Sequence, residues 1–289
     1  MYFILNNNMP DNAARGITKP PLLSSFVTPS GGTRHSNMDE DVRKILELME
    51  SSFRNFEDAM PQKPKLVRKS YGEVYRFQDK DIYQAIIQKL AHAQSTLRAA
   101  LVLLQHGFVH EQGALQRVLD EANEDILFLV YAVTNDCITE LHEKFLDAFW
   151  EEEFNDSGDP FTSEQKRPMV PRRKIRAYIA RIEGVDLDPS RGVELARTMS
   201  KAYSGFVHGA SPHIMDKYGG YPPRFHITGM LGTPRIDEHA SDLWNYIYRT
   251  FISHILVAKA LGAERHVEIM TNYLRRFEEN AGKNYGPHA

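Results

Sequence analysis

The sequence predicts an all-α fold, a single helical bundle of about seven to eight helices, from three observations. Long segments repeat apolar residues at three- and four-residue spacing, which is the period of a helix with one buried face. Several of these segments stop at proline or glycine, as helices do. Alternation of the β type is absent at useful length, and "RFHITGM" is its only weak candidate.

The first 38 residues are expected to form a flexible leader, because they are rich in Asn, Pro, Gly, Ser and Thr and lack a sustained period. A helix follows in "NMDEDVRKILELMESSFRNFEDAMP", with Asn37 as its predicted N-cap and Pro61 as its stop. The basic stretch 62–78 is then predicted to be a plain connection. Residues 39–289 are expected to form the bundle domain.

Two long helices, 79–106 and 109–134, give the strongest signal. Only a short turn at Gly107 separates them, so we expect them to pack as an antiparallel hairpin. The apolar stripe of the first comprises Ile82, Ile86, Leu90, Ala93, Leu97, Leu101 and Leu104. The stripe of the second comprises Val118, Leu119, Ala122, Ile126, Leu129, Val130 and Val133.

Helical periodicity continues to the end of the chain. The loop 155–170 is the best candidate for an internal boundary, although it does not by itself divide the chain into two domains. The segment 211–236 is expected to be a long irregular loop. Around these loops, helices are predicted at 137–154, 171–184, 188–210, 237–262 and 263–282.

Composition excludes several classes of protein. The net charge of -3 provides no global basic field for nucleic acid, so any polyanion would have to be held by a local patch. The single cysteine excludes an intrachain disulfide framework and a zinc site of several thiolates. No secretory signal and no membrane-spanning apolar window appear, so a cytoplasmic protein is expected.

No metal and no other cofactor is expected. None of the 12 histidines has a glutamate three residues before it, which disfavours a di-iron bundle. A His-Glu-x-x-His pair and a glycine-rich phosphate loop are also missing from the sequence.

The candidate site lies in "YSGFVHGASPHIMDKYGGYPPRF", at the end of the predicted helix 188–210. At about 100° per residue, one stripe of this helix is apolar and should face the core. The opposite stripe carries two cations, a hydroxyl and an imidazole, which are the groups that hold and cleave a phosphodiester. An ordinary solvated helix face is the simpler alternative. The apolar stripe is Leu195, Met199, Ala202 and Phe206, and the polar one is Arg197, Lys201, Ser204 and His208.

The hairpin "LRAALVLLQHGFVHEQGALQRVLDEANEDILFLVYA", followed much later by "YSGFVHGAS", resembles a loose group of bacterial helical proteins related to HEPN domains, over about residues 80–260. The resemblance implies metal-independent RNA cleavage, with an arginine shortly before a histidine near a helix end and a site built across a dimer. His208 would be the general acid/base, with Lys201 and Arg197 on the phosphate. Lys201 departs from the pattern, because lysine lacks the bidentate fork of arginine.

Two other charged groups are candidate binding surfaces. Arg117 and Glu121 can pair on the second hairpin helix, next to Glu124 and Asp125. A solvated face is the favoured interpretation, and an inward-turned binding pocket or buried network is the alternative.

The run "EQKRPMVPRRKIRAYIAR" is the one dense basic patch of the sequence and includes Arg172 and Arg173. It has the character of a nucleic-acid backbone contact. Pairing with the acidic "EEEFNDSGD" just before it is the favoured alternative.

The aromatic and glycine content of the loop after His208 favours an ordered segment that walls a cleft, with His213 and Tyr218 as binding residues. Three hypotheses remain open. The first is a dimeric RNA-binding or RNA-cleaving protein centred on His208. The second is a non-catalytic module that binds a protein partner, as in stress or defence systems. The third is a small-molecule-binding bundle around Arg117 and Glu121.

Overall fold

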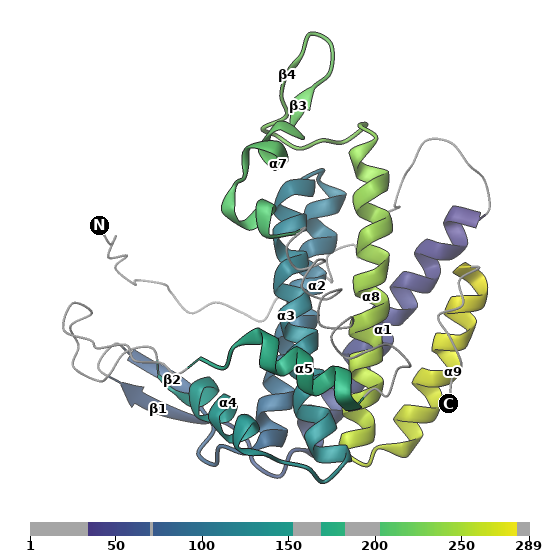
Figure 1. Ribbon diagram of the computed structural model, residues 1–289. Helices are drawn as coiled ribbons and strands as arrows, with labels where there is room; N and C mark the ends of the chain where they lie inside the picture. The colour runs from purple at the N-terminus through teal and green to yellow at the C-terminus, as the bar shows by residue number, and fades with distance from the viewer. Residues whose placement is uncertain (1–33, 70–71, 153–168, 183–202, 282–289) are drawn as a thin grey trace, which may run out of the picture.

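The all-α helical bundle is confirmed by the computed structural model, which describes residues 34–69, 72–152, 169–182 and 203–281 (Figure 1). Within these residues eight helices have defined bounds, and 203–208 form the end of a further one. The helices are α1 (Arg34–Ala59), α2 (Ile82–Gln105), α3 (Val109–Thr134), α4 (Glu140–Trp150), α5 (Arg172–Ile182), α7 (Ser211–Met215), α8 (Arg235–Ala260) and α9 (Glu264–Ala281).

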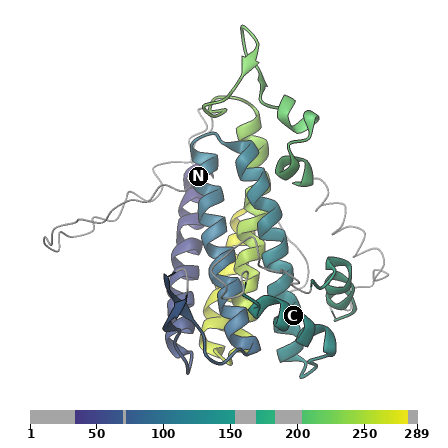
Figure 2. The ribbon, with the colours of Figure 1, turned by 90° about the vertical axis from the view of Figure 1, so that its left-hand side faces the viewer.

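The centre of the bundle is formed by α2, α3 and α8, which contact one another along their lengths (Figures 1 and 2). As the sequence predicts, α2 and α3 form an antiparallel hairpin around Gly107, whose positive φ of 79° suits glycine. Helices α1 and α9 pack against each other and against α8. Helix α5 packs on α3.

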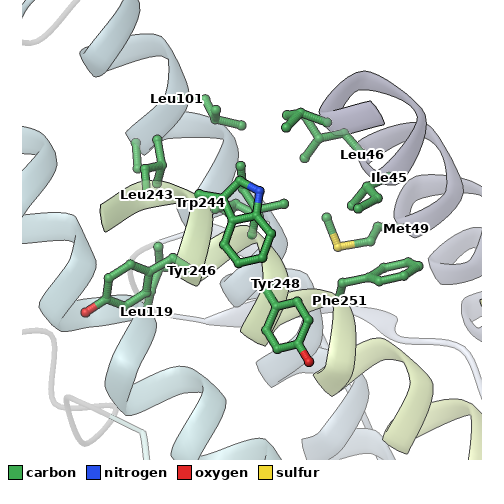
Figure 3. Packing of buried hydrophobic residues seen from close by; sticks show 14 of the residues in the cluster. Ile45, Leu46, Met49, Leu101, Leu119, Leu243, Trp244, Tyr246, Tyr248 and Phe251 are labelled. Atoms are coloured by element: carbon green, nitrogen blue, oxygen red, sulfur yellow. The ribbon is translucent and has the colours of Figure 1, made fainter. Parts of the chain in front are cut away.

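Two apolar clusters fill the interior. In one, Trp244 of α8 stacks between Tyr248 and Phe277, with ring centroids 5.5 and 5.0 Å away. Figure 3 shows side chains of α1, among them Ile45 and Met49, turned toward this part of α8. The other cluster joins α2, α3, α4 and α5 around the fully buried Phe128. Every residue of the predicted stripe of α2 is buried.

The start of the first helix differs from the prediction. Helix α1 begins at Arg34, so Asn37 lies inside the helix and the predicted N-cap is wrong. Five residues assigned to the leader are therefore helical. By contrast, Asp81 caps α2 by accepting a hydrogen bond from the backbone N–H of Gln84 (2.8 Å).

The predicted connection 62–78 contains an antiparallel β-hairpin, β1 (Lys65–Lys69) and β2 (Gly72–Arg76), in which Val67 pairs with Val74. The expectation of no β-structure there is wrong. The alternation is hidden in the sequence because two of the half-buried positions are Lys69 and Arg76. Arg76 donates two hydrogen bonds, of 2.7 and 2.9 Å, to Glu152, which lies just after α4, so a charged side chain occupies an inward position.

The segment between His208 and the start of α8 is mostly irregular, as predicted. It contains the short helix α7 and a hairpin of two short strands, β3 (Tyr218–Gly219) and β4 (Arg224–Phe225). This part projects beyond the end of the bundle in both views (Figures 1 and 2). Separately, the described helices include none with the length and apolar character needed to cross a bilayer.

Candidate functional site

The helix end 203–208 lies on α3 at Gly113. A Cβ added at Gly113 would meet the Phe206 ring at 3.0 Å, so the glycine allows close approach of that ring. Phe206 therefore occupies the inward stripe that the sequence assigns to it and is half-buried. The predicted partners on that stripe, Leu195, Met199 and Ala202, lie outside the described residues.

Three histidines surround the Phe206 ring edge-on. The centroids of His213, His110 and His239 lie 4.5, 5.1 and 5.6 Å from it. Burial lowers the pKa of His110 and of His239, so both favour the neutral form. No three potential ligands among histidine, cysteine, aspartate and glutamate converge on a metal site in the described part of the chain.

His208 ends this helix and is exposed. Gly209 follows with a φ of 61°, and the Ala210 N–H donates to the Gly205 carbonyl (3.0 Å), which is a Schellman closure. The chain then returns so that the His213 imidazole lies over Gly205. A Cβ added to Gly205 would be only 2.1 Å from that ring, so Gly205 leaves the space that His213 occupies.

Residues 207–231, which we call the arm, are tied to the bundle by several bonds. Lys217 pairs with Glu111 of α3, and Asp216 pairs with Arg235 of α8, each at 2.6 Å. At the far side, the Met230 N–H donates to the Gly107 carbonyl (2.8 Å), and the Met230 side chain is buried in the core. The arm is thus a surface segment that is attached to the bundle on both sides.

The arm exposes an unusual number of large apolar side chains. Tyr218 and Phe225 lie against each other with ring centroids 4.9 Å apart, yet both remain exposed, and Tyr221 is fully exposed. Such side chains normally lie inside a protein when they gather in one region. The exposed apolar residues of the arm are Val207, Ile214, Met215, Tyr218, Tyr221, Phe225, Ile227 and Leu231.

Beneath helix end 203–208, α3 and α8 share a buried polar row. Tyr246 donates to Asp120 (3.2 Å), and Arg249 pairs with the same carboxylate. Burial raises the pKa of Asp120, and the Arg249 guanidinium opposes part of that rise. Tyr203 extends the row by donating to Asp242 (3.1 Å), and burial raises its pKa as well.

The row continues toward the arm through two glutamines of α3. Gln112 contacts the His239 ring nitrogen (2.9 Å). Gln116 is fully buried, and neither polar atom of its side chain has a hydrogen-bonding partner among the described residues. Apart from Gln116, these polar groups are hydrogen-bonded or ion-paired inside the bundle, so they link α3 and α8.

Charged residues at the other end of α3 form a buried ion network. Arg172 pairs with Glu124 and Asp125, and Arg176 pairs with Glu124 (2.8 Å). Lys89 of α2 reaches Asp125 at 2.8 Å. The favoured interpretation of Glu124 and Asp125 as a solvated face is wrong. Both carboxylates are buried, and their ion pairs with arginines of α5 link α3 to α5.

The remaining predicted site residues are dispersed. Arg117 pairs with Glu121 (2.6 Å) on the half-exposed face of α3. That pair lies along the same face as Gly113, one helical turn further on. Arg173 is exposed on α5, away from the network made by Arg172. Asp125, which pairs with Arg172, lies about 18 Å along α3 from Gly113, so the ion network is far from the helix end 203–208.

Ser204 and His208 lie on the helix end 203–208, and His213 lies over Gly205 of the same helix end, while Tyr218 begins β3 of the arm. Ser204 and His213 are half-buried, whereas His208 and Tyr218 are exposed. Lys201 and Arg197 lie outside the described residues.

Sequence reasoning missed His110 and His239 as neighbours of this segment. The two are far apart in sequence, and no local spacing brings them to Phe206. Comparison with known protein families, with curated proteins and with solved structures finds no match to this chain.

Proposed function

We propose that this protein is a helical interaction module that associates with a second copy of itself through the arm. The observation that carries the proposal is the exposure of eight large apolar side chains between Val207 and Leu231. A contiguous apolar surface on a globular protein typically marks a site of protein association. The fixed ends of the arm add to this, because an already ordered surface loses little entropy on binding.

A second copy is the partner that the chemistry favours. In a two-fold dimer the same surface patch meets itself, so an apolar patch is complementary to its own copy. Two of the nearby charged side chains, Lys217 and Asp216, are already paired with Glu111 and Arg235, which lowers the repulsion between like arms. The resemblance to HEPN-related proteins also implies a dimer.

The test is the molar mass of the protein across a concentration series, measured by light scattering after size-exclusion chromatography. We expect a dimer for the unaltered chain and a monomer for the double variant Tyr221→Ser, Ile227→Ser. The matched control is Ile138→Ser, which removes an exposed apolar side chain outside the arm and should leave the dimer intact. A chain that stays monomeric at high concentration contradicts the proposal.

RNA cleavage at His208 is the second candidate function. The observation that favours it is the exposed imidazole of His208 at the base of the arm, one helical turn after Ser204. Histidine is a common general acid/base in catalysis, and a dimer made through the arm would bring His208 close to the other subunit.

Incubation of single-stranded RNA with the protein in EDTA separates the two functions. The enzymatic proposal expects cleavage that is lost in His208→Ala and kept in His106→Ala, an exposed histidine at the end of α2. A dimer that does not cleave RNA would support the interaction module and exclude the proposed nuclease activity.

A further inference from the structure

A cavity of about 750 Å³ lies between the β1–β2 hairpin, the C-terminal half of α1, the start of α2 and the end of α4. Its volume falls within the range of cavities that hold small organic ligands. The hairpin is held over it by the bonds of Arg76 to Glu152. In Figure 1 this region lies at the opposite end of the bundle from α7 and the arm, so the two surfaces are independent.

The walls of the cavity are rich in aromatic rings. Phe149 and Trp150 of α4 meet edge-on at 4.8 Å, and Phe77, directly after β2, lies 6.5 Å from Trp150. Phe53 of α1 adds a further ring, and Ile87 of α2 adds an aliphatic side chain. Rings that meet edge-on present both faces and edges, which suits contact with a planar aromatic body.

The charges around the cavity favour an anion. Four cationic side chains line it against three carboxylates. Arg76 and Lys69 both lie beside Glu152, Lys63 lies 4.0 Å from Asp58, and Glu57 pairs with Arg54. Lys80 donates to the Trp150 carbonyl oxygen (3.3 Å) and has no carboxylate partner among the described residues. The cations are Lys63, Lys69, Arg76 and Lys80, and the carboxylates are Glu57, Glu151 and Glu152.

Trp150 places a ring and a cation next to each other. It lines the cavity, and its backbone carbonyl oxygen accepts a hydrogen bond from the Lys80 ammonium group.

We propose that this cavity binds a small aromatic carboxylate. The aromatic body lies among Phe53, Phe149 and Trp150, and the carboxylate accepts a hydrogen bond from the Lys80 ammonium group. Charge-assisted hydrogen bonds of this type are stronger than neutral ones, so the charge of the ligand should contribute much of its affinity.

The first experiment titrates the full chain with 2-naphthoate and follows tryptophan fluorescence. The chain has two tryptophans, and Trp244 lies in the bundle core, so the variant Trp244→Phe reports Trp150 alone. We expect saturable binding of one ligand per chain, confirmed by calorimetry on the unaltered protein. The neutral analogue 2-naphthylmethanol should bind about tenfold more weakly.

The second experiment compares variants by calorimetry. Lys80→Met removes the ammonium group and should weaken the binding of 2-naphthoate about tenfold. Lys44→Met, on the exposed face of α1 and outside the cavity, is the matched control and should bind as the unaltered chain does. Absence of saturable binding, or equal affinities in Lys80→Met and Lys44→Met, overturns the proposal.

Discussion

The interior around α3 and the arm depart from the usual distribution of side chains in opposite directions: polar side chains are buried in the first, and apolar side chains are exposed on the second. Inside the bundle, charged and polar side chains such as Asp120, Asn123 and Glu124 are buried between helices. On the arm, Tyr221 and Ile227 face water. Both of these carboxylates have a cation beside them, Arg249 for Asp120 and Arg176 for Glu124. The arm has no equivalent cover among the described residues, and this exposure is the feature on which the proposed dimer contact rests.

The largest expected effect comes from breaking the buried network. Glu124→Ala leaves Arg172 and Arg176 without one of their carboxylates, and the free energy of unfolding should fall by about 3–5 kcal/mol. Urea unfolding measures it. The control Glu121→Ala removes the half-exposed carboxylate that pairs with Arg117 one turn earlier on α3, and should cost about 0.5 kcal/mol or less. Equal costs for the two variants would refute a buried network.

A second effect is acid sensitivity from His254 of α8, which is fully buried and has no hydrogen-bonding partner among the described residues. Burial lowers its pKa from 6.5 to about 3. Between these values the unfolded chain binds the proton and the folded chain does not, so stability falls as pH falls, by about 1.4 kcal/mol per pH unit.

The test compares urea unfolding at pH 7 and pH 5 for the unaltered chain and for His254→Gln. The difference in pH dependence between the two should be about 2 kcal/mol at pH 5, and subtracting the variant removes contributions from other groups such as Asp120. Parallel pH profiles would show that His254 is not held neutral.

Gly205→Ala should have a smaller effect at the base of the arm. The new methyl group collides with the His213 ring, and we expect a loss of about 1 kcal/mol in stability as the ring moves away. The double variant Gly205→Ala, His213→Ala should recover part of the loss, because the colliding ring is gone. Additive losses in the double variant would mean that the two residues do not contact each other.

The smallest effect is expected on the arm itself. Ile227→Ser should change the unfolding free energy by no more than about 0.5 kcal/mol, measured at a concentration that dissociates the proposed dimer. The same change at the buried Ile247 of α8 should cost about 3 kcal/mol or more. A large cost at Ile227 would show that its side chain supports the fold of one chain.

The sequence predicted those parts of the fold that depend on local pattern. The stripe from Ile82 to Leu104 and the turn at Gly107 are visible in sequence because helical period and glycine conformation are local properties. The β1–β2 hairpin escaped prediction because Lys69 and Arg76 occupy its inward positions, and Glu152, the partner of both, lies on a distant segment.

The candidate site was predicted only in part, for a related reason. His208, His213 and Tyr218 follow one another along the chain, and the structure keeps them in one segment. Phe206 has His110 and His239 as neighbours, and these come from two other helices. The sequence around either histidine does not indicate the contact with Phe206. The inward turn of Glu124 likewise depends on arginines far along the chain.

The attachment of Met230 has a consequence for how the arm can vary. Because Gly107 and Gly229 meet so closely that neither has room for a methyl group, the junction tolerates almost no substitution. The tip at Tyr221 touches little else and can accept insertions or deletions without strain on the junction. Length and sequence can therefore change at the tip while the attachment of Met230 stays constant. The proposed dimer contact could then acquire a new preference without a change in the bundle.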